Sequence, residues 1–185
     1  MIKRLASATL LIGAVLVISA CAHPVGRDWK PAPAVVDTDL IESSYAAADK
    51  LMENLITELD ASKTLLVATF VDIDNVDRSN TLGRMVSEQI GSRITQHGFG
   101  VIEIKLREQL SVRQETGELL LSRDYRALRD GNDAQAVVVG SYALGQDKLY
   151  VNARIVRLGD NVVISAHNYS LPIGSNTRTM IRPKL

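Results

Sequence analysis

Three aspartates in one short polar stretch are the first residues whose spacing could bind a metal ion. Asp72, Asp74 and Asp77 follow an apolar run, and carboxylate oxygens are the ligands that Ca²⁺ prefers. A calcium loop of the EF-hand type beginning at Asp72 needs glycine at its sixth position and glutamate at its twelfth, where this chain has Asp77 and Gly83. We therefore predict no metal site and assign these aspartates to turns and helix capping, with a weak cation site as the alternative.

The remaining residue types that carry catalysis do not form a recognisable site. His23, His97 and His167 show no metal-ligand spacing, and the position of His97 near a predicted helix C-terminus accounts for it electrostatically. No serine lies in a G-x-S-x-G elbow, and Gly98-Phe-Gly100 lacks the third glycine of a dinucleotide loop. We predict that the protein is not an enzyme and binds no cofactor, with a hydrolase assembled from distant residues as the alternative.

The one cysteine of the chain lies at the end of an export signal. Lys3 and Arg4 precede an apolar stretch that ends near Ile18, which is the pattern of a secretory signal peptide over residues 1–20. Ile18-Ser19-Ala20-Cys21 resembles the lipobox of bacterial lipoproteins, which implies cleavage between Ala20 and Cys21 and lipidation of the thiol. A plain secretory peptide with an incidental cysteine is the alternative.

The lipobox resemblance also implies where the anchored protein resides. Two or three acyl chains, palmitate among them, bind a bilayer stably, whereas a single chain binds marginally. Residue 22 is alanine and not the aspartate that resembles an inner-membrane retention signal, so we expect Cys21 to insert in the inner leaflet of the outer membrane. The domain would then face the periplasm.

Charge excludes one large class of partner. The 185-residue chain has 21 basic and 21 acidic residues, and removal of residues 1–20 takes away Lys3 and Arg4, leaving an excess of two acids. A mildly acidic body gives no electrostatic reason to bind nucleic acid. A single cysteine also excludes an internal disulfide.

Residues 21–39 are expected to form a tether. They contain Pro24, Pro31 and Pro33, and proline disfavours helix in the residue before it, so the stretch should be extended and semi-rigid. Trp29, the single tryptophan, lies within it and could rest at the membrane interface, on the domain or on a partner.

The first half of the expected domain, residues 40–173, begins with a helix. Apolar residues recur at helical spacing over residues 40–59, and Asp39 can cap the start. Residues 64–71 form an apolar β-branched run typical of a strand buried on both faces. A second helix is expected from a cap at Ser79 or Asn80 to a turn at Gly98, followed by a strand at 101–104.

The second half is predicted to be mostly β. A short helix over 122–130 precedes strands at 135–144, 149–156 and 162–169, and residues 174–185 are expected to be a polar C-terminal tail. The fold class is therefore α/β (α+β): a mixed five-stranded sheet with a βαβ start, a C-terminal antiparallel meander and helices packed on the sheet.

Residues 103–130 combine charges of both signs. Arginines and carboxylates alternate at a density that usually indicates a solvated, salt-bridged surface. A partner-binding surface is the functional alternative.

Four segments resemble the FlgO family of outer-membrane lipoproteins. They are Val101-Ile-Glu-Ile-Lys-Leu-Arg107, Gly117-Glu-Leu-Leu-Leu-Ser-Arg-Asp124, Ala136-Val-Val-Val-Gly-Ser-Tyr142 and Val151-Asn-Ala-Arg154. The E-x-K-L-R and L-S-R-D pieces are the distinctive ones, and the resemblance covers roughly residues 42–173. The third segment also resembles wider relatives: the N-terminal domain of TolB, the curli secretion lipoprotein CsgG and the peptidoglycan-synthase activator LpoB.

The resemblance implies a function without catalysis. Members of the family are outer-membrane lipoproteins of the flagellar basal-body region that support flagellar stability and motility, which implies protein partners there and allows a homo-oligomer. An envelope-assembly or peptidoglycan-synthase-regulating lipoprotein is the main alternative. A secretion pore ranks lowest, because no spare segment supplies the 9–11-residue alternating strands that such a pore needs.

Overall fold

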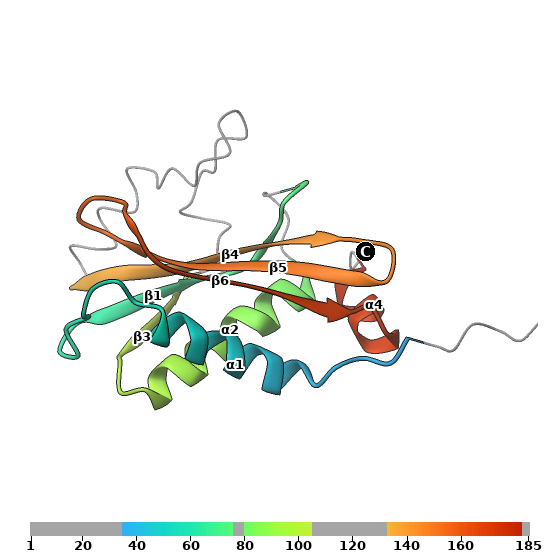
Figure 1. Cartoon of the computed structure of the whole chain (residues 1–185), viewed down its shortest axis with the longest axis horizontal. Helices are drawn as coiled ribbons and strands as arrows, with labels where there is room; N and C mark the ends of the chain where they lie inside the picture. Colours follow the sequence, from blue (N-terminus) through green and yellow to red (C-terminus); the bar gives the residue numbers. More distant parts are fainter. Residues whose placement is uncertain (1–34, 76–79, 105–132, 183–185) are drawn as a thin grey trace, which may run out of the picture. The chain divides into compact units, whose positions relative to one another are not determined.

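One mixed β-sheet organises the computed structural model, which describes residues 35–75, 80–104 and 133–182 (Figure 1). Its strands are β1 (Thr64–Ala68), β2 (Val71–Asp72), β3 (Val101–Ile104), β4 (Ala134–Leu144), β5 (Lys148–Arg157) and β6 (Val163–Pro172). The spatial order is β3-β1-β4-β5-β6, with β2 beside β4. β1 pairs in parallel with β3 and β4, whereas β4, β5 and β6 form an antiparallel meander. The predicted fold class is confirmed, with β2 as an additional short strand.

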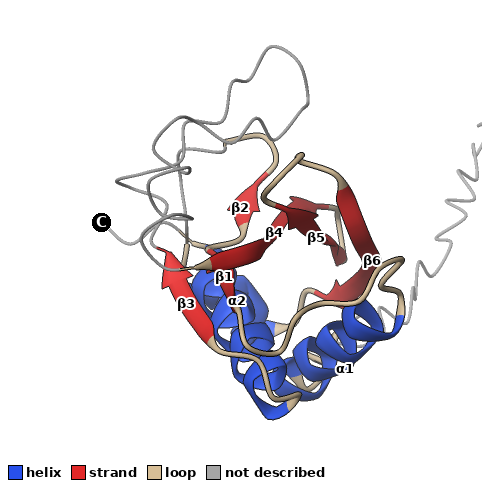
Figure 2. Ribbon diagram, turned by 90° about the vertical axis from the view of Figure 1, so that its left-hand side faces the viewer, coloured by secondary structure: helices blue, strands red, loops and turns tan. Residues whose placement is uncertain are grey.

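Two long helices, α1 (Leu40–Glu53) and α2 (Thr81–Gln96), lie against one face of this sheet (Figure 2). Both begin at the predicted caps, since Asp39 Oδ1 accepts hydrogen bonds from two α1 amides and Asn80 Oδ1 accepts one from Gly83. Gly98 follows α2 with a φ of +94°, a conformation that glycine adopts without strain. Among the described residues, no helix is long and apolar enough to cross a membrane.

α1 ends at Glu53, six residues before the predicted end at Leu59. The residues beyond it bond to β6 instead: the Asn54 side chain donates to the Ala166 carbonyl, and the Ile56 amide donates to the Ile164 carbonyl at 3.0 Å. These bonds replace helical ones because the β6 edge offers unpaired carbonyl groups. In the sequence, apolar residues keep their helical spacing beyond Glu53, because Leu55 and Leu59 still pack against the core.

The run predicted as one strand, residues 64–71, is interrupted at Thr69–Phe70 and continues as β2. The Phe70 amide donates to the Gly83 carbonyl at 3.4 Å instead of to a neighbouring strand. The Phe70 ring is fully buried and lies over Gly140 of β4, where a Cβ atom would overlap the ring. A glycine inside a strand often marks such a close approach.

The alternation predicted for β5 is present. Leu149, Val151, Ala153 and Ile155 are buried in the core between the sheet and the helices, whereas Tyr150 and Arg154 are exposed on the opposite face. β1 is buried on both faces, as predicted for a strand inside a parallel arrangement: Leu65 and Val67 face the helices, and Leu66 faces away from them.

The prediction of a polar tail over residues 174–185 is wrong for most of its length. Residues Ser175–Ile181 form a helix, α4, in which Thr177 is buried and Met180 and Ile181 pack against the main core. α4 is short and mostly polar, so its sequence shows no apolar periodicity from which a helix could be predicted. Contacts with the rest of the fold stabilise it.

Some predictions concern residues outside the described ranges. These are the signal peptide, Cys21, Trp29, most of the tether, Asp77, the helix over 122–130 and nearly all of the mixed-charge segment.

Candidate functional site

The aspartate-rich loop forms a turn in the structure. Asp72 Oδ1 accepts a hydrogen bond of 3.0 Å from the Asp74 amide, and the Asn75 amide donates to the Asp72 carbonyl at 3.1 Å. Asp72 thus stabilises the turn through its side chain and its carbonyl group, as predicted. Among the described residues, no group of three histidine, cysteine, aspartate or glutamate side chains has the geometry to hold a metal ion.

His97 belongs to a polar cluster that joins the two long helices. Its Nε2 lies 2.7 Å from Asp49 Oδ1 in α1, and Arg93 binds the same carboxylate with both Nε at 2.7 Å and an Nη atom at 3.1 Å. The Arg93 guanidinium also lies 5.6 Å from the centre of the Tyr45 ring. Hydrogen bonding by Arg93, with a further bond from His97, holds the pKa of Asp49 below its ordinary value. The cluster fixes α1 to α2 and offers no nucleophile or free base.

The last residues of the predicted tether bind the C-terminal helix. Asp37 accepts hydrogen bonds at the start of α4 from the Asn176 amide at 2.8 Å and from the Thr177 amide at 3.1 Å. The preceding residue, Gly174, supplies no capping side chain, and a Cβ atom there would overlap Asp37. Asp37 therefore acts as the N-terminal cap of a helix 139 residues further along the chain. We call this arrangement the Asp37 clasp.

The charge of Asp37 is part of the clasp. Burial raises the pKa of this half-buried carboxyl group, but hydrogen bonds from the Thr177 side chain and from backbone amides of α4 outweigh burial and leave the pKa lowered. A carboxylate beside the first turn of a helix also interacts favourably with the helix dipole.

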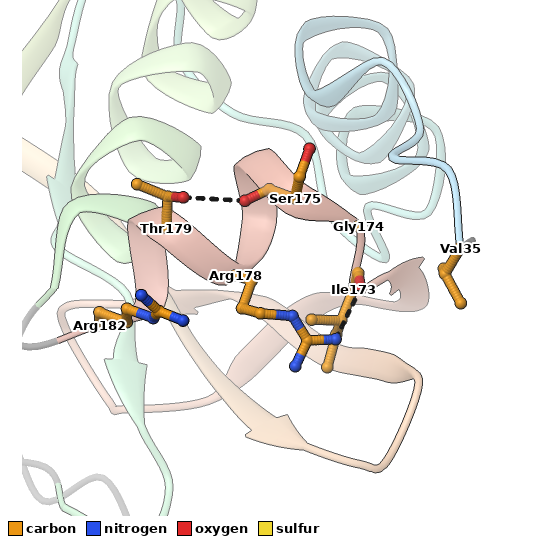
Figure 3. Close-up of a pocket in the computed structure, with 7 residues that line it drawn as sticks. All are labelled: Val35, Ile173, Gly174, Ser175, Arg178, Thr179 and Arg182. Carbon is orange, nitrogen blue, oxygen red and sulfur yellow. Dashed lines mark hydrogen bonds between the residues drawn. The ribbon is translucent and has the colours of Figure 1, made fainter.

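A pocket of about 490 Å³ adjoins the clasp (Figure 3). Val35 and Ile173 give it apolar walls, and Arg178 and Arg182 give it positive charge. Arg178 donates to the Ile173 carbonyl at 3.4 Å, and both guanidinium groups lie on the lower side of α4 in the view. Val35 belongs to the predicted tether, so the pocket lies beside the last residues of that segment.

Removing the Asp37 carboxylate is expected to destabilise the domain. Asp37→Ala should lower the free energy of unfolding at pH 7 by about 1 kcal/mol, the usual effect of replacing a capping aspartate by alanine. Because the folded pKa is lowered, the stabilisation is present above the ordinary value of 3.8 and is lost as pH falls through the folded pKa. Urea denaturation at pH 7 and pH 3 should show the difference from wild type shrinking at the lower pH.

The matched control is Asp147→Ala. Asp147 is an exposed turn residue whose side chain makes no hydrogen bond within the described part of the chain. Its substitution should change stability by less than about 0.5 kcal/mol. Equal stability of Asp37→Ala and wild type at pH 7 would contradict a capping role.

Sequence reasoning missed both long-range polar groups. Asp49 and Arg93 lie on different predicted helices, and Asp37 lies in a segment interpreted as tether, so local patterns gave no partner for either acid. One feature of the sequence could have pointed to the clasp. α4 begins after Gly174, which has no side chain to cap the helix, so the cap must come from another segment.

Comparisons with known proteins concern the domain. The model of the family described as FlgO protein matches residues 45–176. None of the curated proteins compared with the chain matches it.

Several solved structures resemble the chain at low sequence identity. The C-terminal domain of LpoB from Salmonella enterica is 12% identical with a TM-score of 0.49, covering 72% of this chain and 98% of that domain. The NMR structure of Escherichia coli LpoB is 14% identical with a TM-score of 0.48, covering 89% of this chain and 85% of that one. The lipoprotein GNA1162 from Neisseria meningitidis is 15% identical with a TM-score of 0.38, covering 62% and 85%.

Proposed function

The chain belongs to the FlgO family, and from this premise we propose that it is a lipid-anchored outer-membrane protein that supports the flagellar base through protein contacts. The observation that carries the proposal is the extent of the family match, which spans residues 45–176 and so includes nearly every described element from α1 to β6. Family membership supports a role in the cell envelope. Within the cell envelope, we propose the flagellar base as its location.

The lipobox supports the anchoring part. Ala20 and Cys21 flank the expected cleavage site, and the acylated Cys21 would hold the mature chain in the inner leaflet with the domain in the periplasm. The Asp37 clasp would then define where the tether ends, because Asp37 is bound to α4 and only the residues between Cys21 and Asp37 remain as a spacer. A fixed junction suits a protein that must present one surface at a defined distance from a membrane.

A role without catalysis agrees with the chemistry of the described residues. Asp49, Arg93 and His97 are bound to one another, Asp72 forms a turn, and Asp37 caps a helix, so each of these polar groups has a structural use. The proposal therefore assigns function to surfaces and to the anchor.

The test is the composition of isolated flagellar basal bodies with outer membrane attached. We expect the protein to be enriched there relative to bulk outer membrane, and a strain that lacks it should have fewer intact filaments and swim poorly. An even distribution across the outer membrane, together with normal filaments in the deletion strain, would contradict the flagellar role. Restoring the wild-type gene in the deletion strain controls for effects on neighbouring genes.

A further inference from the structure

The sheet face opposite α1 and α2 is partly exposed along the meander: Tyr150 and Arg154 are exposed there, whereas Val137, Val139 and Val156 on the same face are buried. Strand register places residues of β4, β5 and β6 side by side there, and Ile73 extends β2 next to Ala143 because its amide donates to the Tyr142 carbonyl at 2.9 Å. We call this surface the meander face; it consists of Ile73, Ser141, Ala143, Lys148, Tyr150, Asn152, Arg154, Ala166, Asn168, Ser170 and Pro172.

The composition of the meander face differs from that of an ordinary solvated surface. Lys148 and Arg154 are its charged residues, and none of its residues is acidic, although the whole chain has as many acidic as basic residues. Protein interfaces are depleted in lysine, glutamate and aspartate and enriched in tyrosine and arginine, and energetic hot spots favour tyrosine and arginine most. The meander face has both enriched types on one strand, and Lys148 is its one residue of a depleted charged type.

A row of apolar side chains crosses the meander face. Ala143 pairs with Tyr150 across the β4–β5 ladder, and Ile73 continues the row on the other side of Ala143. Ile73 is 52% exposed and Tyr150 is 54% exposed, so two large, partly exposed apolar side chains flank Ala143. Contiguous exposed apolar surface of this kind marks binding sites more often than scattered single residues do.

Arg154 lies beside this row without an acidic partner. Its cross-strand neighbours are Val139 and Ala166, which are apolar, and no ion pair among the described residues includes its guanidinium. A carboxylate from outside could therefore bind Arg154 in bidentate fashion without displacing an existing pair.

We propose that the meander face binds a periplasmic protein that places a carboxylate on Arg154 and apolar side chains on Ile73, Ala143 and Tyr150. Charge selects this occupant over two others. A second copy packed face to face would bring together two surfaces whose charged residues, Lys148 and Arg154, are all basic, and like charges repel. Binding to anionic lipid takes clusters of about four to eight basic residues, whereas the meander face has two.

The inference deepens the proposed function by naming the surface that meets the partner, and its test separates the two. Tyr150 is replaced in the full-length protein by the photoreactive residue p-benzoylphenylalanine, in cells, in three backgrounds: wild type, Arg154→Glu and the control Arg84→Glu on the exposed surface of α2. Met85, which lies 37% exposed on α2, carries the photoreactive residue in a second control. Adducts are measured by immunoblot and identified by mass spectrometry.

We expect a protein adduct from position 150 whose yield falls at least about tenfold in Arg154→Glu, as for loss of a hot-spot arginine, and stays unchanged in Arg84→Glu. Position 85 should give no adduct that depends on Arg154. Arg154→Gln should lower the yield less than charge reversal does. Because Arg154 is exposed, its variants should unfold at the wild-type temperature.

Each other outcome overturns the inference. These outcomes are the absence of a protein adduct, an adduct that persists in Arg154→Glu, an adduct with a second copy of this chain, and an adduct with lipid. An Arg154-dependent adduct with a periplasmic protein unrelated to the flagellum would support the meander face and contradict the flagellar role.

Discussion

Replacing Gly140 by alanine is expected to lower the free energy of unfolding by about 3 kcal/mol, because the new methyl group would overlap the buried Phe70 ring. The ring cannot move aside cheaply. Its residue is fixed by the bond from the Phe70 amide to Gly83, whose own Cβ position overlaps the Phe70 carbonyl. Denaturation in guanidinium chloride, followed by circular dichroism, measures the change.

A second substitution tests the cause. Phe70→Leu removes part of the ring, so Gly140→Ala should cost less in a Phe70→Leu background than in wild type, with a coupling of about 1–2 kcal/mol. Gly159→Ala is the matched glycine control, since a Cβ atom there meets nothing within 4 Å, and it should change stability by less than about 0.5 kcal/mol. Additive effects at positions 70 and 140 would show that the overlap is not the cause.

Cys21→Ala is expected to remove the protein from the outer membrane. Two acyl chains contribute ~0.8 kcal/mol per buried CH₂, or roughly 20 kcal/mol for two chains of ordinary length, far more than any single side-chain contact. Without the thiol, lipidation and the cleavage that depends on it should both fail. The variant should therefore incorporate no labelled palmitate, migrate as a larger unprocessed chain and fall more than about tenfold in the outer-membrane fraction.

Ala22→Ser controls for disturbance of the signal region, because it changes the neighbouring residue and keeps Cys21. It should be processed, labelled and sorted as wild type is. A Cys21→Ala protein of mature size in the outer membrane would instead favour the interpretation of residues 1–20 as a plain secretory signal peptide.

Sequence patterns predicted those parts of the fold that depend on local periodicity. β5 alternates apolar and polar residues with a period of two, and Asp39 and Asn80 cap helices a few residues away, so each could be recognised within its own segment. The end of α1 was placed too late because Leu55 and Leu59 keep the helical spacing of buried residues after the backbone has left the helix.

The features that sequence reasoning missed all join distant segments. α4 depends on Asp37, and the break between β1 and β2 depends on Gly83 and Gly140, which lie 13 and 70 residues beyond Phe70. A pattern within a window of ten to twenty residues cannot contain the pairs of Asp37 with α4 or of Phe70 with Gly140. The same reason explains why the meander face, whose members come from β2, β4, β5 and β6, was not recognised before the strand register was known.

The Asp37 clasp also decides how the domain responds to a mechanical load. If the anchor at Cys21 holds while a partner moves with the rotating or bending flagellum, tension travels along the tether and enters the domain at Asp37. There it meets the two hydrogen bonds that α4 backbone amides donate to Asp37, before it reaches Asp39 and the first turn of α1. The force is thus shared between the residues before α1 and the C-terminal helix α4. This sharing protects the exposed first turn of α1 from being pulled away from the sheet.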